Sequence, residues 1–451
     1  MVSSFFNDLV QTLGDRSRYL LGWSREAVKT GDLPSIGEAL LSRRGEASGV
    51  ALARTLLESY AAAPLATRLG FLTALADRFG PDLGRLDAAV AAYRREPGPA
   101  TVAALHEAAE APRQELFRRL NLAPGGTAAL VRMRAELLDH LASRPDLHPV
   151  DADFAHLFSS WFNRGFLVLR PIDWATPANI LERIIRYEAV HQIQGWDDLR
   201  ARLEPPDRRC FGFFHPQLVD EPLIFVEVAL TTETPGAIAP LLATDRRPIR
   251  PQDATTAVFY SISNTQKGLG GVSFGHFLIK QVVDDLKRDL PNLRFFLTLS
   301  PVPGFAAWLA AERTSGSTDI LDDEAREALS VLEEAGWASD PHRAELVRRP
   351  LIAAAGAYFL RVRTAKGRPL DPVARFHLGN GARLERVNFL GDTSAKGLRQ
   401  SHGLMVNYCY DLEEIERNHE AYAEKGEVIA SSAVRRLARP DLAIREMVTP
   451  T

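Results

Sequence analysis

The sequence changes character near residue 150, and this change limits the folds that the chain can adopt. Residues 48–147 are rich in Ala, Leu, Arg and Glu, and apolar residues recur three and four positions apart, as in VALARTLLESYAAA. Breaks containing Gly and Pro interrupt the pattern at residues 80–81, 97–99 and 124–126. No repeat of fixed period runs through it. This part predicts a bundle of helices, whose role is packing against another domain or another subunit.

The later residues alternate between strand and helix patterns. Short apolar runs predict strands, at residues 210–214, 222–230, 256–263, 294–299, 374–378 and 404–410. The segment FGHFLIKQVVDDLKRDL predicts an amphipathic helix whose apolar face consists of Phe274, Leu278, Val282 and Leu286. Residues 320–364 also predict helix. We therefore predict a multidomain α+β protein, with an all-α bundle at residues 1–152 and a mixed sheet flanked by helices at residues 153–451.

The composition excludes several functional classes. The chain has 451 residues, and its formal net charge of −3 gives no general attraction to nucleic acid or to anionic membranes. No apolar run reaches the ~18 residues of a membrane span, and the N-terminus lacks a secretory signal pattern. Cys210 and Cys409 form no C-x-x-C pair and no metal-spaced cluster, which fits a reducing compartment. We expect a cytoplasmic protein without a metal site that binds neither nucleic acid nor membrane.

The segment QKGLGGVSFGHF, at residues 266–277, contains a G-x-S-x-G pattern centred on Ser273. That pattern marks the nucleophile elbow of serine hydrolases, in which the serine follows a strand directly. Here seven polar and glycine-rich residues, 264–270, separate the pattern from the predicted strand. Ser273 then falls in the first turn of a helix, where serine commonly caps the backbone. A thioesterase that uses Ser273 is therefore the weakest interpretation.

The same segment also fits a phosphate-binding loop. Four glycines, at positions 268, 270, 271 and 275, would allow a ligand to approach the backbone. The first N–H groups of the following helix, with Lys267 nearby, would receive a pyrophosphate. Neither the Rossmann pattern nor the P-loop pattern is met, so nucleotides, coenzyme A and sugar phosphates all remain open. A glycine-rich turn that only packs is the remaining alternative.

Four long segments follow one another along the chain: FYSISNTQKGLGGVSFGHFLIKQVV, LSPVPGF, ARFHLGNGARLERVNFLGD and SHGLMVNYCY. With these segments the chain resembles the malonyl-CoA decarboxylase family from about Phe154 to Tyr410, and more loosely over its first 150 residues. The resemblance implies a helical domain followed by a catalytic domain with the acetyltransferase-like GNAT fold. Two splayed strands, here TAVFYSIS and RFFLTL, would admit the pantetheine arm of coenzyme A. The resemblance implies a coenzyme-binding loop at Gly270, Gly271, Val272, Ser273, Phe274, Gly275 and His276.

The resemblance also implies the reaction, in which malonyl-CoA loses carbon dioxide and becomes acetyl-CoA through a thioester enolate. The thioester carbonyl absorbs the electron pair, so we expect no metal and no organic cofactor; coenzyme A is part of the substrate. Ser300 matches the family's catalytic serine, and Pro301 disfavours a helical backbone at that serine. His377 would donate a proton to the enolate carbon, in its titration range near neutrality. Tyr410 would orient His377 or donate to the thioester oxygen.

Each of these residues also has a structural interpretation. Ser300 could cap the next helix, His377 could be a satisfied core histidine, and Tyr410 could be a strand tyrosine with a buried ring. At Ser273 better-known family members carry a glutamate, so His377 lacks one expected carboxylate partner. Acetyl transfer to an amine and a silent acyl-CoA sensor remain as alternative functions. The family further suggests a homo-oligomer, a dimer or tetramer, formed through the helical domain.

Overall fold

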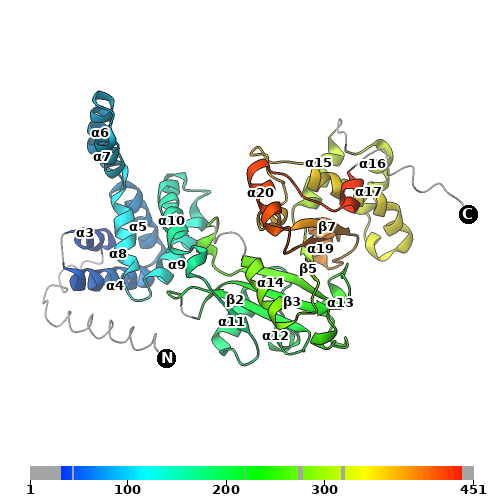
Figure 1. Cartoon of the computed structure of the whole chain (residues 1–451). Helices are drawn as coiled ribbons and strands as arrows, with labels where there is room; N and C mark the ends of the chain where they lie inside the picture. The colour runs from blue at the N-terminus through cyan, green and yellow to red at the C-terminus, as the bar shows by residue number, and fades with distance from the viewer. Residues whose placement is uncertain (1–31, 43–44, 219, 273–277, 316–319, 439–451) are drawn as a thin grey trace, which may run out of the picture. The chain divides into compact units, whose positions relative to one another are not determined.

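The computed structural model describes residues 32–42, 45–218, 220–272, 278–315 and 320–438 (Figure 1). The chain divides into two units, which we call the helical unit and the sheet unit. The helical unit comprises residues 1–167, 215–219 and 266–274, and the sheet unit comprises residues 168–214, 220–265 and 275–451. The boundary expected at residue 152 lies inside one helix, His148–Trp161. No helix among the described residues has the length and apolarity that a membrane span requires.

The described helices of the helical unit follow the breaks in the sequence. They are α3 (Leu33–Leu41), α4 (Glu46–Ala62), α5 (Leu65–Asp77), α6 (Leu83–Arg95), α7 (Pro99–Ala109), α8 (Pro112–Asn121), α9 (Gly126–His140) and α10 (His148–Trp161). The predicted breaks all fall at helix ends, where Pro99 opens α7 and Gly126 opens α9. The core of the unit includes Phe117 and Phe154, whose stacked rings lie 4.0 Å apart between centroids. The predicted helical bundle is confirmed.

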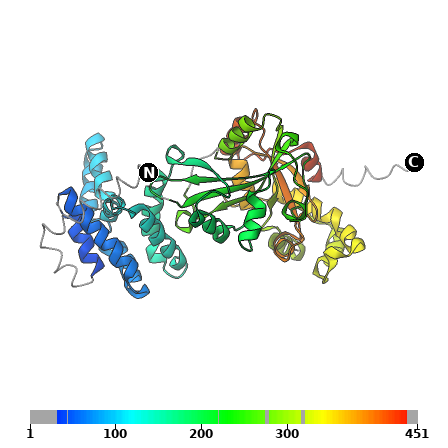
Figure 2. The ribbon, with the colours of Figure 1, turned by 90° about the horizontal axis from the view of Figure 1, so that it is seen from below.

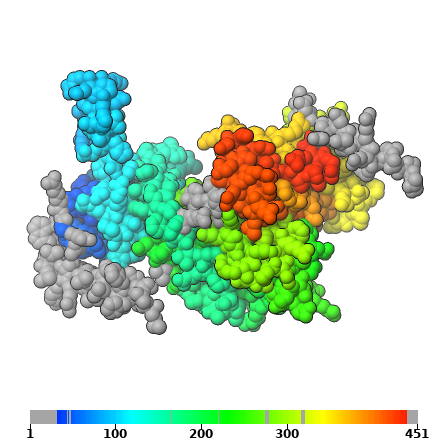
Figure 3. Space-filling view, viewed as in Figure 1, coloured from blue at the N-terminus to red at the C-terminus, as the bar shows by residue number. Residues whose placement is uncertain are grey.

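The hairpin of α6 and α7 stands out from the other helices of this unit (Figures 1 and 3). No residue of α6 is buried, and Ala108 is the only buried residue in α7. Leu83 and Val102 are 69% and 52% exposed, respectively. The hairpin therefore contributes little to the core of its own unit.

The sheet unit is built on a mixed sheet. Among the described residues its strands are β1 (Val168–Ile172), β2 (Arg208–Phe214), β3 (Pro222–Thr231), β4 (Thr256–Asn264), β5 (Phe295–Thr298), β6 (Ser300–Pro301), β7 (Arg383–Asn388) and β8 (Met405–Cys409). Their order is β1-β2-β3-β4-β5-β8-β6, with β7 paired to β8. Figure 2 shows β1 to β4 side by side in this unit. Every pair is antiparallel except β4 with β5, which is parallel.

Most of the strand predictions are confirmed, and one is wrong. Five apolar runs form β2, β3, β4, β5 and β8. The run at 374–378 is instead part of the helix α18 (Pro372–Gly379). Pro372 occupies the first turn, and the Asp371 side chain caps it by accepting a hydrogen bond from the Ala374 N–H at 2.7 Å. These start signals outweigh the short apolar run.

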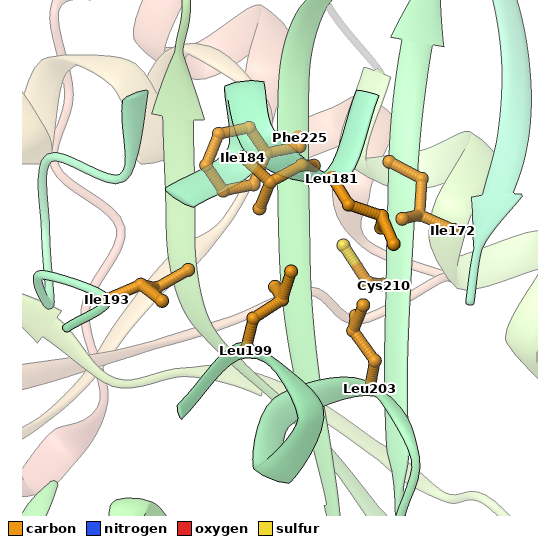
Figure 4. Close-up of a cluster of buried hydrophobic side chains, with 8 residues drawn as sticks. All are labelled: Ile172, Leu181, Ile184, Ile193, Leu199, Leu203, Cys210 and Phe225. Atoms are coloured by element: carbon orange, nitrogen blue, oxygen red, sulfur yellow. The ribbon is translucent and has the colours of Figure 1, made fainter. Parts of the chain in front are cut away.

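Helices cover the sheet and complete the unit. They are α11 (Ala178–Tyr187), α12 (Trp196–Leu203), α13 (Ala239–Leu242), α14 (Leu278–Asp289), α15 (Phe305–Thr314), α16 (Asp323–Leu329), α17 (Pro341–Leu360), α18, α19 (Ala395–Ser401), α20 (Ile415–Lys425) and α21 (Ser432–Leu437). Side chains from α11, α12, the segment between these helices and the strands form one buried cluster, which Figure 4 shows: Ile172, Leu181, Ile184, Ile193, Leu199, Leu203, Cys210 and Phe225.

The amphipathic helix predicted after β4 is confirmed over its described part. In α14 the buried residues include Leu278, Val282 and Leu286, as expected. Phe274 lies outside the described residues. The helices predicted within residues 320–364 are also present, as α16 and α17.

Candidate active site

The strands β4 and β5 pair over a short length and then part. Their parallel register joins Thr256–Phe259 to Phe295–Thr298 and is extended by the Leu299 N–H, which donates to the Phe259 carbonyl at 3.0 Å. β4 continues to Asn264, paired with β3, whereas the chain after β5 enters β6 and pairs with β8. This parting of β4 and β5 is the arrangement expected of the splayed strand pair. The residues that follow β5 along the chain lie where the two strands part.

Ser300 begins β6, immediately beyond the end of β5, and is 5% exposed. Its Oγ lies 2.9 Å from Thr298 Oγ1 and 3.1 Å from His377 Nε2. The cap of the following helix, α15, is Gly304. Ser300 therefore does not cap α15, as its structural interpretation would require, and its hydroxyl faces His377.

His377 lies in the last turn of α18 and is 3% exposed. Its Nδ1 is 2.8 Å from the Tyr410 hydroxyl, while its Nε2 contacts Ser300. Tyr410 directly follows β8, is 1% exposed, and donates its N–H to the Phe296 carbonyl at 2.8 Å. The structure thus joins the three predicted catalytic residues in one hydrogen-bonded row, Ser300–His377–Tyr410.

Burial controls the protonation of this row. It lowers the pKa of His377 from 6.5 to about 3, and it raises the pKa of Tyr410 well above its usual value. The expectation that His377 titrates near neutrality is therefore wrong, because a buried imidazolium would lose its hydration. At neutral pH one ring nitrogen carries a proton and the other accepts a hydrogen bond. Among the described residues, the partner of Nδ1 is the phenol of Tyr410 rather than a carboxylate.

The sequence did not single out the residues that hold this row in place. Thr298 Oγ1 accepts the Tyr408 N–H at 3.0 Å, and the Thr298 carbonyl accepts the Asn407 side-chain amide at 2.6 Å. Thr298 and Asn407 are both 0% exposed. One signal was available: in a strand, alternate residues share a face, so the threonine two positions before Ser300 belongs beside it. The support from Tyr408 and Asn407 required the register of β8.

The predicted coenzyme-binding loop is described only in part. Gly270 and Gly271 are exposed, Val272 is buried, and Gly271 has a φ of +75° with open space where a side chain would begin. Ser273, Phe274, Gly275 and His276 lie outside the described residues. The backbone of the described part is therefore open to a ligand at Gly270 and Gly271.

The residues just before this loop are fixed by contacts within the helical unit. A side chain at Gly268 would begin 1.9 Å from the Val131 carbonyl oxygen, so this glycine serves close packing. Arg134 Nη1 donates to the carbonyls of Gly268 and Gly270 at 2.8 and 2.9 Å. Lys267, expected to add charge for a phosphate, forms an ion pair with Asp139. The packing interpretation therefore applies to Gly268.

A mixed sheet with a parting β4–β5 pair, and a buried serine–histidine–tyrosine row at the end of β5, is the arrangement expected of a protein with the acetyltransferase-like fold. Residues 79–162 and 165–448 match the N-terminal and C-terminal domains of malonyl-CoA decarboxylase, respectively. The chain belongs to the malonyl-CoA decarboxylase family.

Relatives agree with this assignment. The mitochondrial malonyl-CoA decarboxylase of Rattus norvegicus is 35% identical over 405 residues, which cover 82% of each chain. The enzyme of Anser anser anser is 36% identical over 344 residues, covering 71% of this chain and 68% of the relative.

Solved structures of malonyl-CoA decarboxylases from two bacteria are also similar. That from Rhodopseudomonas palustris is 63% identical with a TM-score of 0.87, and that from Agrobacterium vitis is 60% identical with a TM-score of 0.86. Each comparison covers 90% of this chain and 99% of the other.

Proposed function

We propose that this protein converts malonyl-CoA to acetyl-CoA and carbon dioxide. The observation that carries the proposal is the buried Ser300–His377–Tyr410 row at the end of β5, in a chain of the malonyl-CoA decarboxylase family. The substrate in this proposal, malonyl-CoA, is taken from the names of the relatives reported above, which are malonyl-CoA decarboxylases. Within this proposal, the row provides hydroxyl groups and an imidazole for proton transfer.

The chemistry makes three demands. The bond between the carboxylate carbon and the α-carbon breaks, and its electron pair moves onto the thioester oxygen, so that carbon dioxide leaves and an enolate remains. A hydrogen-bond donor must stabilise that oxygen as its charge grows. One proton must then reach the α-carbon, which completes acetyl-CoA. Because the thioester is itself the electron acceptor, we propose that the reaction needs no metal or organic cofactor.

Ser300 is the group of the row that we place against the substrate. Both ring nitrogens of His377 are engaged, one with Ser300 and one with Tyr410, so a proton from the ring passes through one of these hydroxyls. We propose that Ser300 gives its proton to the α-carbon and regains one from His377 Nε2. His377 Nδ1 then draws a proton from Tyr410, and one proton from solvent restores the row after acetyl-CoA has left. An enolate is a strong carbon base, so these uncharged donors suffice.

The coenzyme A portion of the substrate would bind at the glycine-rich loop. Gly270 and Gly271 offer an exposed backbone, and Val272 together with the residues outside the described range, Ser273, Phe274, Gly275 and His276, completes the proposed loop. Backbone N–H groups at a helix start suit a pyrophosphate. This part of the proposal is tested by the affinity for coenzyme A of a Gly271→Val variant, which should fall.

Self-association and location belong to the same proposal. We propose a cytoplasmic homodimer or homotetramer formed through the helical unit, in which the exposed apolar side chains of α6 and α7 would become covered. Light scattering after size-exclusion chromatography measures the mass directly. A monomer of 49.8 kDa at micromolar concentration would contradict this proposal.

The decisive experiment incubates the purified protein with malonyl-CoA and follows acetyl-CoA by mass spectrometry. Ser300→Ala should lower kcat about 100-fold or more, since it removes the donor that faces the substrate. His377→Asn should lower it comparably. A folded wild-type protein that forms no acetyl-CoA would end the proposal. Consumption of acetyl-CoA when amines are offered would instead identify an acetyltransferase.

A further inference from the structure

The hydrogen bonds between β8 and the chain that carries Ser300 depart from a regular ladder beside the catalytic row. β6 pairs with β8 through Ser300 and Val406. Two residues earlier in the chain, this register places Thr298 opposite Tyr408. In a regular antiparallel ladder the Thr298 carbonyl would accept the Tyr408 N–H. That N–H instead donates to the Thr298 side chain, at 3.0 Å from Oγ1, so the Thr298 carbonyl needs another donor.

The side chain of Asn407 is that donor. Its Nδ2 lies 2.6 Å from the Thr298 carbonyl oxygen and 3.3 Å from the Pro235 carbonyl oxygen. Its Oδ1 accepts hydrogen bonds from Arg386 Nε at 3.1 Å and from Asn388 Nδ2 at 2.8 Å. A side-chain amide offers two donor hydrogens and two acceptor lone pairs, so all four are used here. Because Asn407 is 0% exposed, the amide cannot turn without leaving buried polar groups unpaired.

This exchange of partners fixes the acceptor that the catalytic serine uses. Ser300 Oγ donates to Thr298 Oγ1 at 2.9 Å and lies 3.1 Å from His377 Nε2. Because the Ser300 proton is directed at Thr298, the neutral ring of His377 carries its proton on Nε2 and directs it at Ser300. Thr298 Oγ1 thus accepts both the Tyr408 N–H and the Ser300 hydroxyl. The position of Thr298 Oγ1 therefore determines where the Ser300 hydroxyl lies.

We propose that Asn407 is a positioning residue, which binds the Thr298 carbonyl and thereby holds the Thr298 hydroxyl in place for Ser300. Asn407 and Tyr408 are consecutive in β8, so their side chains point to opposite faces of the sheet. The Tyr408 ring stacks on His377. Asn407 therefore lies behind the sheet, on the face away from the imidazole, and acts on the row only through Thr298.

The loss of this amide has a defined structural consequence. Without Asn407 the Thr298 carbonyl has no side-chain donor, and the Tyr408 N–H returns to it as in a regular ladder. Thr298 Oγ1 then loses the hydrogen bond that fixes it, and Ser300 moves away from His377. The effect of this movement on the rate rests on the proposed function, whereas the movement itself does not.

The kinetic test compares Asn407→Ala with Asn388→Ala. Each variant removes one of two buried amides that bind each other, but only Asn407→Ala removes the donor to Thr298. Asn407→Ala should lower kcat for malonyl-CoA about 10- to 100-fold, since a small displacement of a reacting group has effects of this size. KM should stay within about twofold of wild type. Asn388→Ala should keep kcat within about twofold, because Arg386 Nε still holds Asn407 Oδ1.

A crystal structure of each variant measures the geometry without using the reaction. In Asn407→Ala the Tyr408 N–H should donate to the Thr298 carbonyl. The distance between Ser300 Oγ and His377 Nε2 should then exceed about 3.5 Å, beyond hydrogen-bond range. In Asn388→Ala that distance should stay at the 3.1 Å seen here.

The two measurements separate this inference from the proposed function. A wild-type protein that is inactive on malonyl-CoA, with the expected rearrangement in Asn407→Ala, would refute the decarboxylase and support the role of Asn407. In an active enzyme, a loss of kcat without the rearrangement, or the rearrangement without a loss of kcat, would overturn that role. So would an Asn407→Ala variant that matches Asn388→Ala in both measurements. If Asn407→Ala does not fold, Asn407→Asp replaces it, because it keeps the shape and both acceptors but lacks the amide donor.

Discussion

The rings of His377 and Tyr408 lie face to face, with centroids 4.6 Å apart and planes inclined by 24°. Both residues are nearly fully buried. An aromatic ring thus covers one side of the imidazole, while its two nitrogens bind hydroxyls in the plane. This environment offers no water to an imidazolium, which is the physical reason for the low pKa of His377.

The first prediction concerns stability against pH. The folded pKa of His377, about 3, lies below the 6.5 of the free side chain. Between these values the unfolded chain binds a proton that the folded chain does not, so His377 destabilises the fold progressively as the pH falls below about 6.5. His377→Asn should lose less of its melting temperature than wild type on going from about pH 7 to about pH 5. An identical pH dependence in both proteins would contradict the low pKa.

The second prediction concerns the phenol of Tyr410. Tyr410→Phe keeps the ring, which packs edge-on against Phe259, and removes the partner of His377 Nδ1. We expect kcat to fall about tenfold, because a buried ring nitrogen loses its hydrogen bond. Tyr260→Phe is the control: in the described part of the chain its buried hydroxyl has no hydrogen-bond partner, so the change should leave kcat intact. Steady-state kinetics of both variants decides the matter.

The third prediction concerns the cap of the helix that carries His377. Asp371 accepts the Ala374 N–H, and burial raises the pKa of the Asp371 carboxyl from 3.8 to about 6. Asp371→Ala should cost about 1 kcal/mol of unfolding free energy and lower kcat as α18 frays. Asp371→Asn keeps an acceptor without the buried charge and should be at least as stable as wild type near pH 7.5. Denaturant unfolding at that pH measures both, and equal losses in the two variants would refute the cap.

The fourth prediction contrasts two glycines of the proposed coenzyme-binding segment. Gly271→Ala introduces a side chain at positive φ in open space and should cost about 1 kcal/mol. Gly268→Ala places a carbon against the Val131 carbonyl and should cost more, because backbone must move. Thermal unfolding ranks the two variants. A Gly268 variant as stable as the Gly271 variant would contradict the close packing seen here.

Several features could be predicted from sequence because they are local or ordered along the chain. The helical bundle followed from its 3.6-residue periodicity, and β2, β3 and β4 followed from long apolar runs. The four family segments identified Ser300, His377 and Tyr410, which the structure brings together.

The missed features depend on tertiary structure. Residues 374–378 form a helix because Asp371 and Pro372 start one, against the strand pattern of the run itself. The low pKa of His377 depends on burial by Tyr408, and the hydrogen bond that Thr298 accepts from the Tyr408 N–H depends on the register of β8. β1 was missed because most of its residues are exposed, so its sequence carries little apolar pattern.

The contacts of Arg134 indicate that the N-terminal domain of the family match should not be stable when it is cloned without the C-terminal domain. Its guanidinium, 3% exposed, donates to backbone carbonyls of Gly268 and Gly270, more than 100 residues beyond the end of the N-terminal domain match. In a fragment truncated near residue 162, the buried guanidinium of Arg134 would lose its two carbonyl partners, and among the contacts of the described residues its ion pair with Asp151 would remain. The helical unit therefore depends on contacts with Gly268 and Gly270, which come much later in the sequence. A fragment that ends at the boundary of the N-terminal domain match should be unstable, because it lacks these contacts.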